Sequence, residues 1–259
     1  WTIAKAGAHI VADSTLYGCT FALLNHGMTR YGVEVSFIDT SNLEEVRANL
    51  KENTVAVYLE TPANPNLKIA DIKEISKIAH EFNKDIKVVC DNTFATPYLQ
   101  RPLELGADVV VHSATKYLNG HGDVIAGLMR HCENARAIAE MLSKHEKVEK
   151  VYFPGLETSA GHDIAVKQMR DFGGMVSFEV KGGKTAGMKF VNALKLCTIA
   201  VSLGDAETLV EHPASMTHSP YSPEELKEAG IPEGLVRLSA GLENKEDIIA
   251  DIEQALAQI

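Results

Sequence analysis

The chain has 259 residues, of which 45% are hydrophobic and 23% charged, and its formal net charge is −10. These values are typical of a soluble globular protein with one or two domains, and they exclude a disordered or low-complexity chain. Lys and Arg are scattered and fewer than Asp and Glu, so no nucleic-acid partner is expected. No apolar run is long enough to span a membrane and no signal peptide is visible, so no membrane partner is expected either.

Five short runs rich in β-branched and apolar residues predict strands in the first half of the chain. Helix-length stretches separate them, and in residues 71–80 an apolar face is formed by Ile72, Ile75, Ile78 and Ala79. This alternation predicts an α/β fold with a mostly parallel sheet and helices on both faces. The predicted strands are 9–12, 34–38, 55–59, 87–90 and 109–112.

The pattern changes after residue 130. It predicts a smaller C-terminal α+β domain, so we expect one domain over 1–128 and a second over 129–259. At the join, the stretch 123–128 (DVIAGL) lacks turn residues before a helix near His131, so either a strand runs directly into a helix or residues are absent there. The second domain is predicted to contain helices at 135–142, 186–194 and 245–257, and strands at 148–153, 175–180 and 235–238.

Reactive side chains follow the predicted strands of the first half. In a parallel sheet the carboxyl ends of the strands meet at one edge, where ligands bind. Such a group suits pyridoxal phosphate (PLP), which needs an amine for a Schiff base, a carboxylate at its pyridinium nitrogen, an aromatic face and donors for its phosphate. The candidates are Lys116 for the amine, Asp91 for the carboxylate, Tyr17 for stacking, and Ser113 and Thr115 for the phosphate.

The same residues allow other interpretations. Lys116 taken alone is a surface lysine, and Asp91 a turn or helix-cap residue. Ser113 and Lys116 match the S-x-x-K pattern of serine acyl-enzymes, but the accompanying S-D-N and K-T-G are missing. Residues 181–185 (KGGKT) resemble the end of a P-loop, yet Phe178 stands where its first glycine is required. No metal site is expected, because His112 and His121 lack metal-ligand spacing.

The four cysteines, at positions 19, 90, 132 and 197, are widely spaced. They form no C-x-x-C pair and no dense framework of the kind that marks a disulfide-stabilised secreted domain. We therefore expect reduced thiols and a cytoplasmic protein.

Six further segments of the chain are ETPANP (60–65), DNT (91–93), VHSATKYLNGH (111–121), VSLG (201–204), HPASMT (212–217) and VRLSAGLE (236–243). These segments resemble those of the PLP-dependent Cys/Met metabolism (trans-sulfuration) enzymes, which have the aspartate-aminotransferase-like fold, PLP fold type I. The resemblance implies that Lys116 forms the Schiff base, that Asn64 lies near the ring oxygen of the cofactor and that Ser202 lies near the lysine and substrate. It implies that Arg237 binds the substrate carboxylate, which a guanidinium holds with two parallel hydrogen bonds.

Within this family, the segment LYGCT (16–20), with Cys19, resembles the members that release methanethiol, 2-oxobutanoate and ammonia from L-methionine. We therefore expect a carbon–sulfur lyase in which Tyr17 and Cys19 belong to the catalytic site and Cys19 also contacts the substrate. Cystathionine γ-lyase and O-acetylhomoserine sulfhydrylase activities of the same family are alternatives, as is a non-catalytic, cofactor-free scaffold. The resemblance also implies a homo-oligomer, a dimer with shared active sites and commonly a tetramer, and a longer N-terminal part than this chain has.

Overall fold

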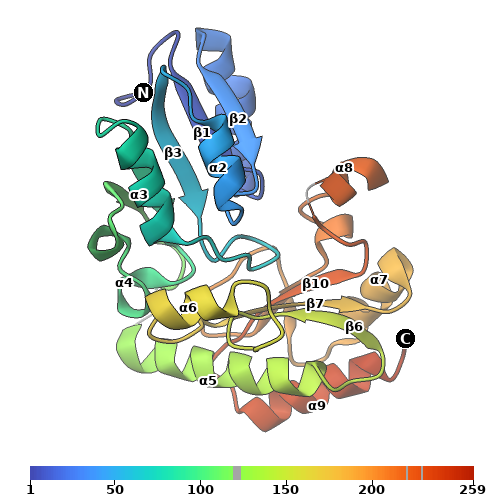
Figure 1. The fold of residues 1–259 in the computed structure, drawn as a ribbon. Coiled ribbons are helices and arrows are strands. Elements are labelled where there is room, and N and C mark those ends of the chain that lie inside the picture. The colour runs from blue at the N-terminus through green and yellow to red at the C-terminus, as the bar shows by residue number, and fades with distance from the viewer. Residues whose placement is uncertain (119–123, 220, 229) are drawn as a thin grey trace.

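Two five-stranded sheets organise the molecule (Figure 1), whose computed structural model describes residues 1–118, 124–219, 221–228 and 230–259. The first sheet has the strand order β2-β1-β3-β4-β5, and all its strands are parallel. The strands are β1 (His9–Asp13), β2 (Glu34–Ile38), β3 (Thr54–Glu60), β4 (Lys87–Asp91) and β5 (Val109–Val111). The helical segments along this part of the chain are α1 (Gly18–Ala22), η1 (Leu23–Gly27), η2 (Met28–Tyr31), α2 (Leu43–Asn49), α3 (Ile72–Phe82), α4 (Thr96–Leu99) and η3 (Pro102–Leu105).

Both faces of the first sheet are buried. Successive strand residues point to opposite faces, and Val11 and Val57 pack in one apolar cluster with residues of α2 and α3. Their neighbours Ile10 and Ala56 pack in a second cluster with Met28 on the other side. The predicted parallel sheet with helical cover on both faces is therefore confirmed.

Helix α3 shows how the local sequence sets an element. The side chain of Asp71 accepts a hydrogen bond from the Glu74 N–H, which caps the start of the helix. Ile72, Ile75 and Ile78 are buried beneath the helix, on the face that the spacing predicted. The helix continues beyond the predicted 71–80 and ends at Phe82.

The second sheet has the order β6-β7-β10-β9-β8 and is antiparallel except for the β8–β9 pair. Figure 1 shows α5 and α9 beneath it, and its core includes residues of α5, α7 and α9. β8 and β9 were missed by the sequence prediction because strands of two and three residues carry no period. The elements are α5 (Val124–Leu142), β6 (Val148–Tyr152), α6 (His162–Gln168), β7 (Met175–Val180), α7 (Gly183–Ala193), β8 (Thr198–Ile199), β9 (Leu209–Glu211), η4 (Pro213–Ser215), α8 (Pro223–Glu228), β10 (Leu235–Ser239) and α9 (Lys245–Leu256).

Strand β10 links this core to the first sheet. Its residues Val236 and Leu238 enter the core between the sheet and the helices, so the alternating Arg237 and Ser239 lie on the opposite face of the sheet. That face is turned toward the first half of the chain, because the Ser239 hydroxyl lies 3.2 Å from the Tyr117 hydroxyl. Arg237 is thereby held, fully buried, between the two sheets.

Helix α5 crosses the predicted domain boundary. It begins at Val124, so the alternative in which 123–128 continues as a strand into the following helix is wrong for residues 124–128. The apolar stretch 124–128, which resembled a strand, forms the start of α5. Residue 128 lies inside α5, and the division into domains at that point stays a prediction. His121 lies outside the described residues.

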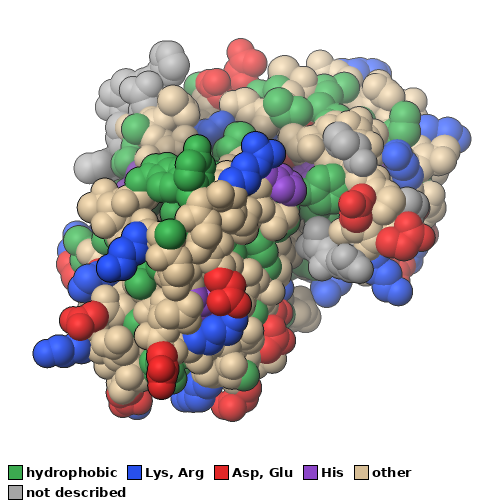
Figure 2. Space-filling model, turned by 90° about the horizontal axis from the view of Figure 1, so that it is seen from above, with side chains coloured by type: hydrophobic (Ala, Val, Ile, Leu, Met, Phe, Trp, Pro, Cys, Tyr) green, Lys and Arg blue, Asp and Glu red, His purple; other side chains and the backbone are tan. Residues whose placement is uncertain are grey.

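The surface carries mixed charges. On the face seen in Figure 2, acidic and basic side chains are interspersed over the molecule. Within the described part of the chain, no helix has both the length and the apolar character needed to cross a membrane.

Candidate active site

A cavity of about 560 Å³ opens where the carboxyl ends of the first sheet face β10. Eight of the nine residues predicted for the site line it, namely Tyr17, Cys19, Asn64, Asp91, Ser113, Thr115, Lys116 and Arg237. The ninth, Ser202, has an exposed side chain, and its backbone carbonyl accepts a hydrogen bond from Arg237. The structure thus brings together groups that lie more than 200 residues apart in the sequence.

Lys116 lies in a turn just after β5, where its backbone N–H donates to the Ser113 carbonyl. The next residue, Tyr117, is buried and its hydroxyl lies 3.2 Å from the Ser239 hydroxyl, so the turn is attached to β10. Burial lowers the pKa of Lys116, and the positive charge of Arg237 lowers it further, while Glu211 opposes both effects. The Schiff-base and proton-transfer chemistry of a lysine requires the neutral amine. At a given pH, a larger fraction of Lys116 is neutral than of a lysine in water.

Asp91 is the last residue of β4, and a short chain of hydrogen bonds joins it to β5. Its Oδ1 accepts from both the N–H and the hydroxyl of Thr93, at 3.0 and 2.6 Å. The Thr93 hydroxyl oxygen in turn accepts the Ser113 N–H at 2.8 Å. The carboxylate and the Ser113–Thr115 turn are therefore held in fixed relation, and the hydroxyls of Ser113 and Thr115 lie 3.1 Å apart.

Tyr17 precedes α1 and lines the cavity, and the residue is 53% exposed. Its backbone N–H donates to the Glu60 carboxylate at 2.8 Å, which fixes the start of the Tyr17–Cys19 segment over the end of β3. The Cys19 side chain beside its hydroxyl raises the pKa of Tyr17. The phenol consequently keeps its proton over a wider pH range than a free tyrosine.

Glu60 itself is buried at the end of β3. Burial raises the pKa of Glu60 to about 8, and the negative charge of Asp91 adds to this, while the Tyr17 N–H opposes it. Glu60 therefore keeps its proton at neutral pH, so the ends of the neighbouring strands β3 and β4 do not carry two facing negative charges.

Arg237 is contacted by protein oxygens at both terminal nitrogens. Nη1 donates to the Asn64 side-chain oxygen at 2.9 Å, and Nη2 donates to the Val201 and Ser202 carbonyls, each at 3.1 Å. Nη1 also lies 2.8 Å from a carboxylate oxygen of Glu211, on the adjacent strand. The guanidinium therefore has a defined orientation toward the cavity.

Sequence reasoning assigned no role to several residues of the cavity or of its wall. Glu60 was visible as the first residue of the ETPANP segment, whereas Glu211 ends a three-residue strand that was not predicted. The HPASMT segment indicated Thr217 but not His218. The unassigned residues at the site are Glu60, Thr93, Glu211, Thr217, His218 and Tyr221.

The cavity fits PLP in its donor set. It contains a half-buried amine of lowered pKa, a carboxylate locked by Thr93, an exposed aromatic ring and two adjacent hydroxyls. These are the groups that the cofactor needs, and the volume is within the range of small-molecule sites.

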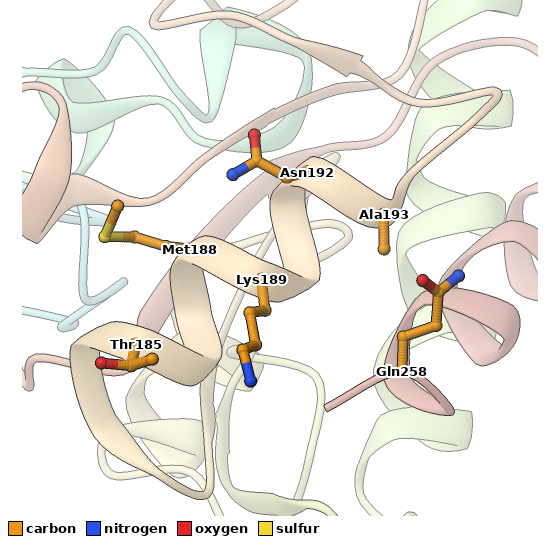
Figure 3. Close-up of a pocket in the computed structure, with 6 residues that line it drawn as sticks. All are labelled: Thr185, Met188, Lys189, Asn192, Ala193 and Gln258. Atoms are coloured by element: carbon orange, nitrogen blue, oxygen red, sulfur yellow. The ribbon is translucent and has the colours of Figure 1, made fainter.

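A second hollow, of about 570 Å³, lies over α7 (Figure 3). The figure shows Thr185, Met188, Lys189 and Asn192 along α7, with Gln258 on the facing segment. None of the predicted site residues lies there. Within the described ranges, no group of three His, Cys, Asp or Glu residues is placed to hold a metal ion.

Comparison with known proteins defines the class of this fold and site. The family model for Cys/Met metabolism PLP-dependent enzymes matches residues 1–131 and 128–257. The chain belongs to this family, and its cofactor is pyridoxal phosphate.

Individual members of the family differ in how similar they are to this chain. The chain is 60% identical to the L-methionine gamma-lyase of Fusobacterium nucleatum subsp. nucleatum, over all of this chain and 76% of the relative. It is 53% identical to the L-methionine gamma-lyase of Treponema denticola, over all of this chain and 75% of the relative. The similarity to the cystathionine beta-lyase of Lactococcus lactis subsp. cremoris is lower, at 44% over 97% of this chain and 77% of the relative.

A solved structure has the same fold. The crystal structure of metB from Corynebacterium glutamicum aligns with a TM-score of 0.93 and 40% identity, covering 99% of this chain and 76% of that one. The PLP fold type I architecture expected from the sequence is thereby confirmed.

Proposed function

We propose that the protein catalyses the PLP-dependent γ-elimination of L-methionine, consuming water and giving methanethiol, 2-oxobutanoate and ammonia. The observation that carries the proposal is the convergence of an amine, a carboxylate, a phenol beside a thiol and a guanidinium on one cavity. Support also comes from the relatives of 53 to 60% identity, which are L-methionine gamma-lyases.

Lys116 and Asp91 serve the cofactor in this proposal. Lys116 would hold PLP through its amine, Asp91 would keep the ring nitrogen protonated, and the hydroxyls of Ser113 and Thr115 would donate to the phosphate. When bound, PLP acts as an electron sink for the substrate Cα. Lys116 Nζ then takes the Cα proton, a role helped by burial, which favours the neutral amine.

Tyr17 would stack on the cofactor ring and act as the acid at the sulfur. Its hydroxyl gives a proton to the departing thiolate, and the raised pKa caused by Cys19 keeps that proton in place until it is needed. Cys19 lines the cavity beside it and would contact the γ-substituent.

Arg237 and Asn64 position the amino acid. The substrate carboxylate would bind the Arg237 guanidinium. Asn64 uses its side-chain oxygen to hold Arg237, which leaves its amide N–H groups for the ring oxygen of the cofactor. Ser202 adds a backbone carbonyl that orients Arg237 and a hydroxyl near the lysine and substrate.

We further propose a cytoplasmic homotetramer built from dimers with shared sites, and a PLP-binding domain over 1–128 followed by an α+β domain over 129–259. Support for an interruption of the family pattern near residue 128 comes from the alignments. The comparison with the Fusobacterium protein extends over 302 residues, more than the 259 of this chain. The family model matches in two pieces, residues 1–131 and 128–257, which overlap at 128–131. Light scattering of the purified protein tests the oligomeric state.

The decisive experiment is to titrate the purified protein with PLP, record the visible absorption, and reduce with borohydride for peptide mapping. We expect label at Lys116, loss of label in Lys116→Ala, and retention in Lys77→Ala, since Lys77 is an exposed lysine of α3. Product analysis with methionine, cystathionine and O-acetylhomoserine then separates the activities. Label at another lysine would refute the assignment of Lys116, whereas no visible band would favour the cofactor-free scaffold.

A further inference from the structure

Glu211 and Arg237 form a buried pair on neighbouring strands. They face each other in the β9–β10 register, so their side chains lie on the same side of the sheet. Arg237 Nη1 lies 2.8 Å from Glu211 Oε1, and the side chains are 4% and 1% exposed. The charge of Glu211 is therefore applied directly to the guanidinium and is not screened by water.

The other contacts of Arg237 indicate that a ligand carboxylate competes with Glu211 for the guanidinium. A carboxylate takes two parallel N–H groups from a guanidinium, but Nη2 already donates to two backbone carbonyls and Nη1 donates to Asn64. The carbonyls and the amide are neutral and cannot change charge. Among these contacts, Glu211 alone repels an arriving carboxylate and can lose that charge by protonation.

The pair is also poorly built for stability. In the described structure, neither carboxylate oxygen of Glu211 has a hydrogen bond of good geometry. A buried ion pair without such bonds contributes little to folding, because the loss of hydration exceeds the attraction. Its presence against Arg237, a residue that lines the cavity, is better explained by the chemistry of the site.

We propose that Glu211 sets the affinity of the carboxylate site: an incoming α-carboxylate displaces the Glu211 carboxylate from Arg237, and Glu211 takes up one proton from solvent as this happens. The inference rests on the role of Arg237 in the proposed function. The net charge around the guanidinium then stays the same before and after binding.

The surroundings of Glu211 favour proton uptake. Burial raises the pKa of Glu211, while the charge of Arg237, the Thr217 hydroxyl and the charge of Lys116 oppose the rise. Glu60 and Tyr17 face Arg237 from the first half of the chain. His218 adds no positive charge that would hold Glu211 ionised, because burial and Arg237 lower the pKa of that histidine. A second carboxylate bound at Arg237 raises the proton affinity of Glu211 further.

The test uses the PLP-loaded protein and glycine, an amino acid with the α-carboxylate but no γ-leaving group. Calorimetry in two buffers of different ionisation heat counts the protons taken up, and the absorbance of the bound cofactor reports binding. Glycinamide, which lacks the carboxylate, is the matched probe, and each proton count is corrected for the ionisation of the probe's own amine. We expect the wild-type protein at pH 8 to take up close to one proton more with glycine than with glycinamide. Equal counts for the two probes would overturn the inference.

The variant Glu211→Gln keeps the shape and removes the charge. At pH 8 we expect it to bind glycine about ten-fold more tightly than the wild type, since a neighbouring like charge costs at least about one pKa unit of interaction. The advantage should vanish as the pH falls and Glu211 becomes protonated. Glu179→Gln on β7, a carboxylate whose pKa is also raised by burial, should change neither quantity. If Glu211→Gln binds glycine with weaker or unchanged affinity while glycine still shifts the spectrum, the inference is refuted and the proposed function stands. If the wild-type holoprotein binds neither glycine nor methionine, the proposed function is refuted as well.

Discussion

Gly204 shows how closely the chain packs around the reactive lysine. Its backbone has φ +76°, and a Cβ there would lie 2.8 Å from the Tyr117 nitrogen and 3.2 Å from the Lys116 Cα. Its N–H donates to the Ser239 hydroxyl, which also contacts Tyr117. The position of Lys116 therefore depends on a residue without a side chain, 88 positions later in the sequence.

For Gly204→Ala we expect a loss of roughly 1–3 kcal/mol of unfolding free energy from the left-handed backbone, together with weaker PLP binding as the turn at Lys116 shifts. Gly7→Ala is the matched control, because Gly7 has φ +83° but a Cβ there meets no atom within 4 Å. Urea unfolding and a PLP titration measure both quantities. Equal PLP affinity in the two variants would show that the contact with Lys116 is unimportant.

Glu60 should make the unfolding free energy of the protein depend on pH. Its pKa is raised from 4.5 to about 8 in the folded protein, so between these values the folded state holds a proton that the unfolded state has released. Stability should therefore fall as the pH rises through this window, by up to about 1.4 kcal/mol per pH unit for one proton. Glu60→Gln should flatten the slope measured by urea unfolding from pH 5 to pH 8. A slope identical to that of the wild type would show that Glu60 ionises normally.

At the scale of single residues, sequence reasoning found the groups whose chemistry is distinctive. Lys116, Asp91 and Arg237 were predicted and line the cavity. Glu60 and Glu211 received no role because a carboxylate at a strand end is usually a surface or capping residue. Only the tertiary structure shows that both are buried beside other charges.

Among the elements, long periodic segments were predictable and short ones were not. The range of β7 was predicted at its observed bounds, and α3 was located by its isoleucine spacing. β9 has three residues, and its place beside β10 depends on long-range pairing. The apolar stretch before His131 was ambiguous between strand and helix, since its composition suits both, and it forms the first turns of α5.

The capping of α3 can be tested directly. Asp71→Ala removes the acceptor for the Glu74 N–H, and we expect a loss of about 1 kcal/mol in unfolding free energy. Asp71→Asn retains a capping oxygen and should cost only a small part of this. Urea denaturation followed by circular dichroism compares the two. If the alanine and asparagine variants were equally stable, the cap would contribute nothing.

At the scale of the whole molecule, the parallel first sheet and the appended α+β half followed from the sequence pattern, but the way they face each other did not. The strand order of either sheet and the approach of β10 to the first sheet depend on contacts between distant segments. Composition and periodicity carry no information about such contacts. The cavity is formed by this approach, so its wall from the second half was only partly foreseen.

The core beneath the second sheet should dominate the stability of that half. Phe178 is completely buried and packs edge-to-face on Phe190, with ring centroids 5.4 Å apart. We expect Phe178→Ala to lower the unfolding free energy by about 3–5 kcal/mol. Phe82→Ala at the end of α3, where the residue is 50% exposed, should cost less than about 1 kcal/mol. Similar losses in the two variants would contradict the observed packing.

The hydrogen bond between Asn64 and Arg237 joins residues 173 positions apart, and the one between Tyr117 and Ser239 spans 122. Closing loops of this length costs entropy that local contacts do not offset, so such contacts form late on a folding pathway. We therefore expect the helices to form before the cavity does. A newly made chain must complete most of its architecture before it has anywhere to bind its cofactor.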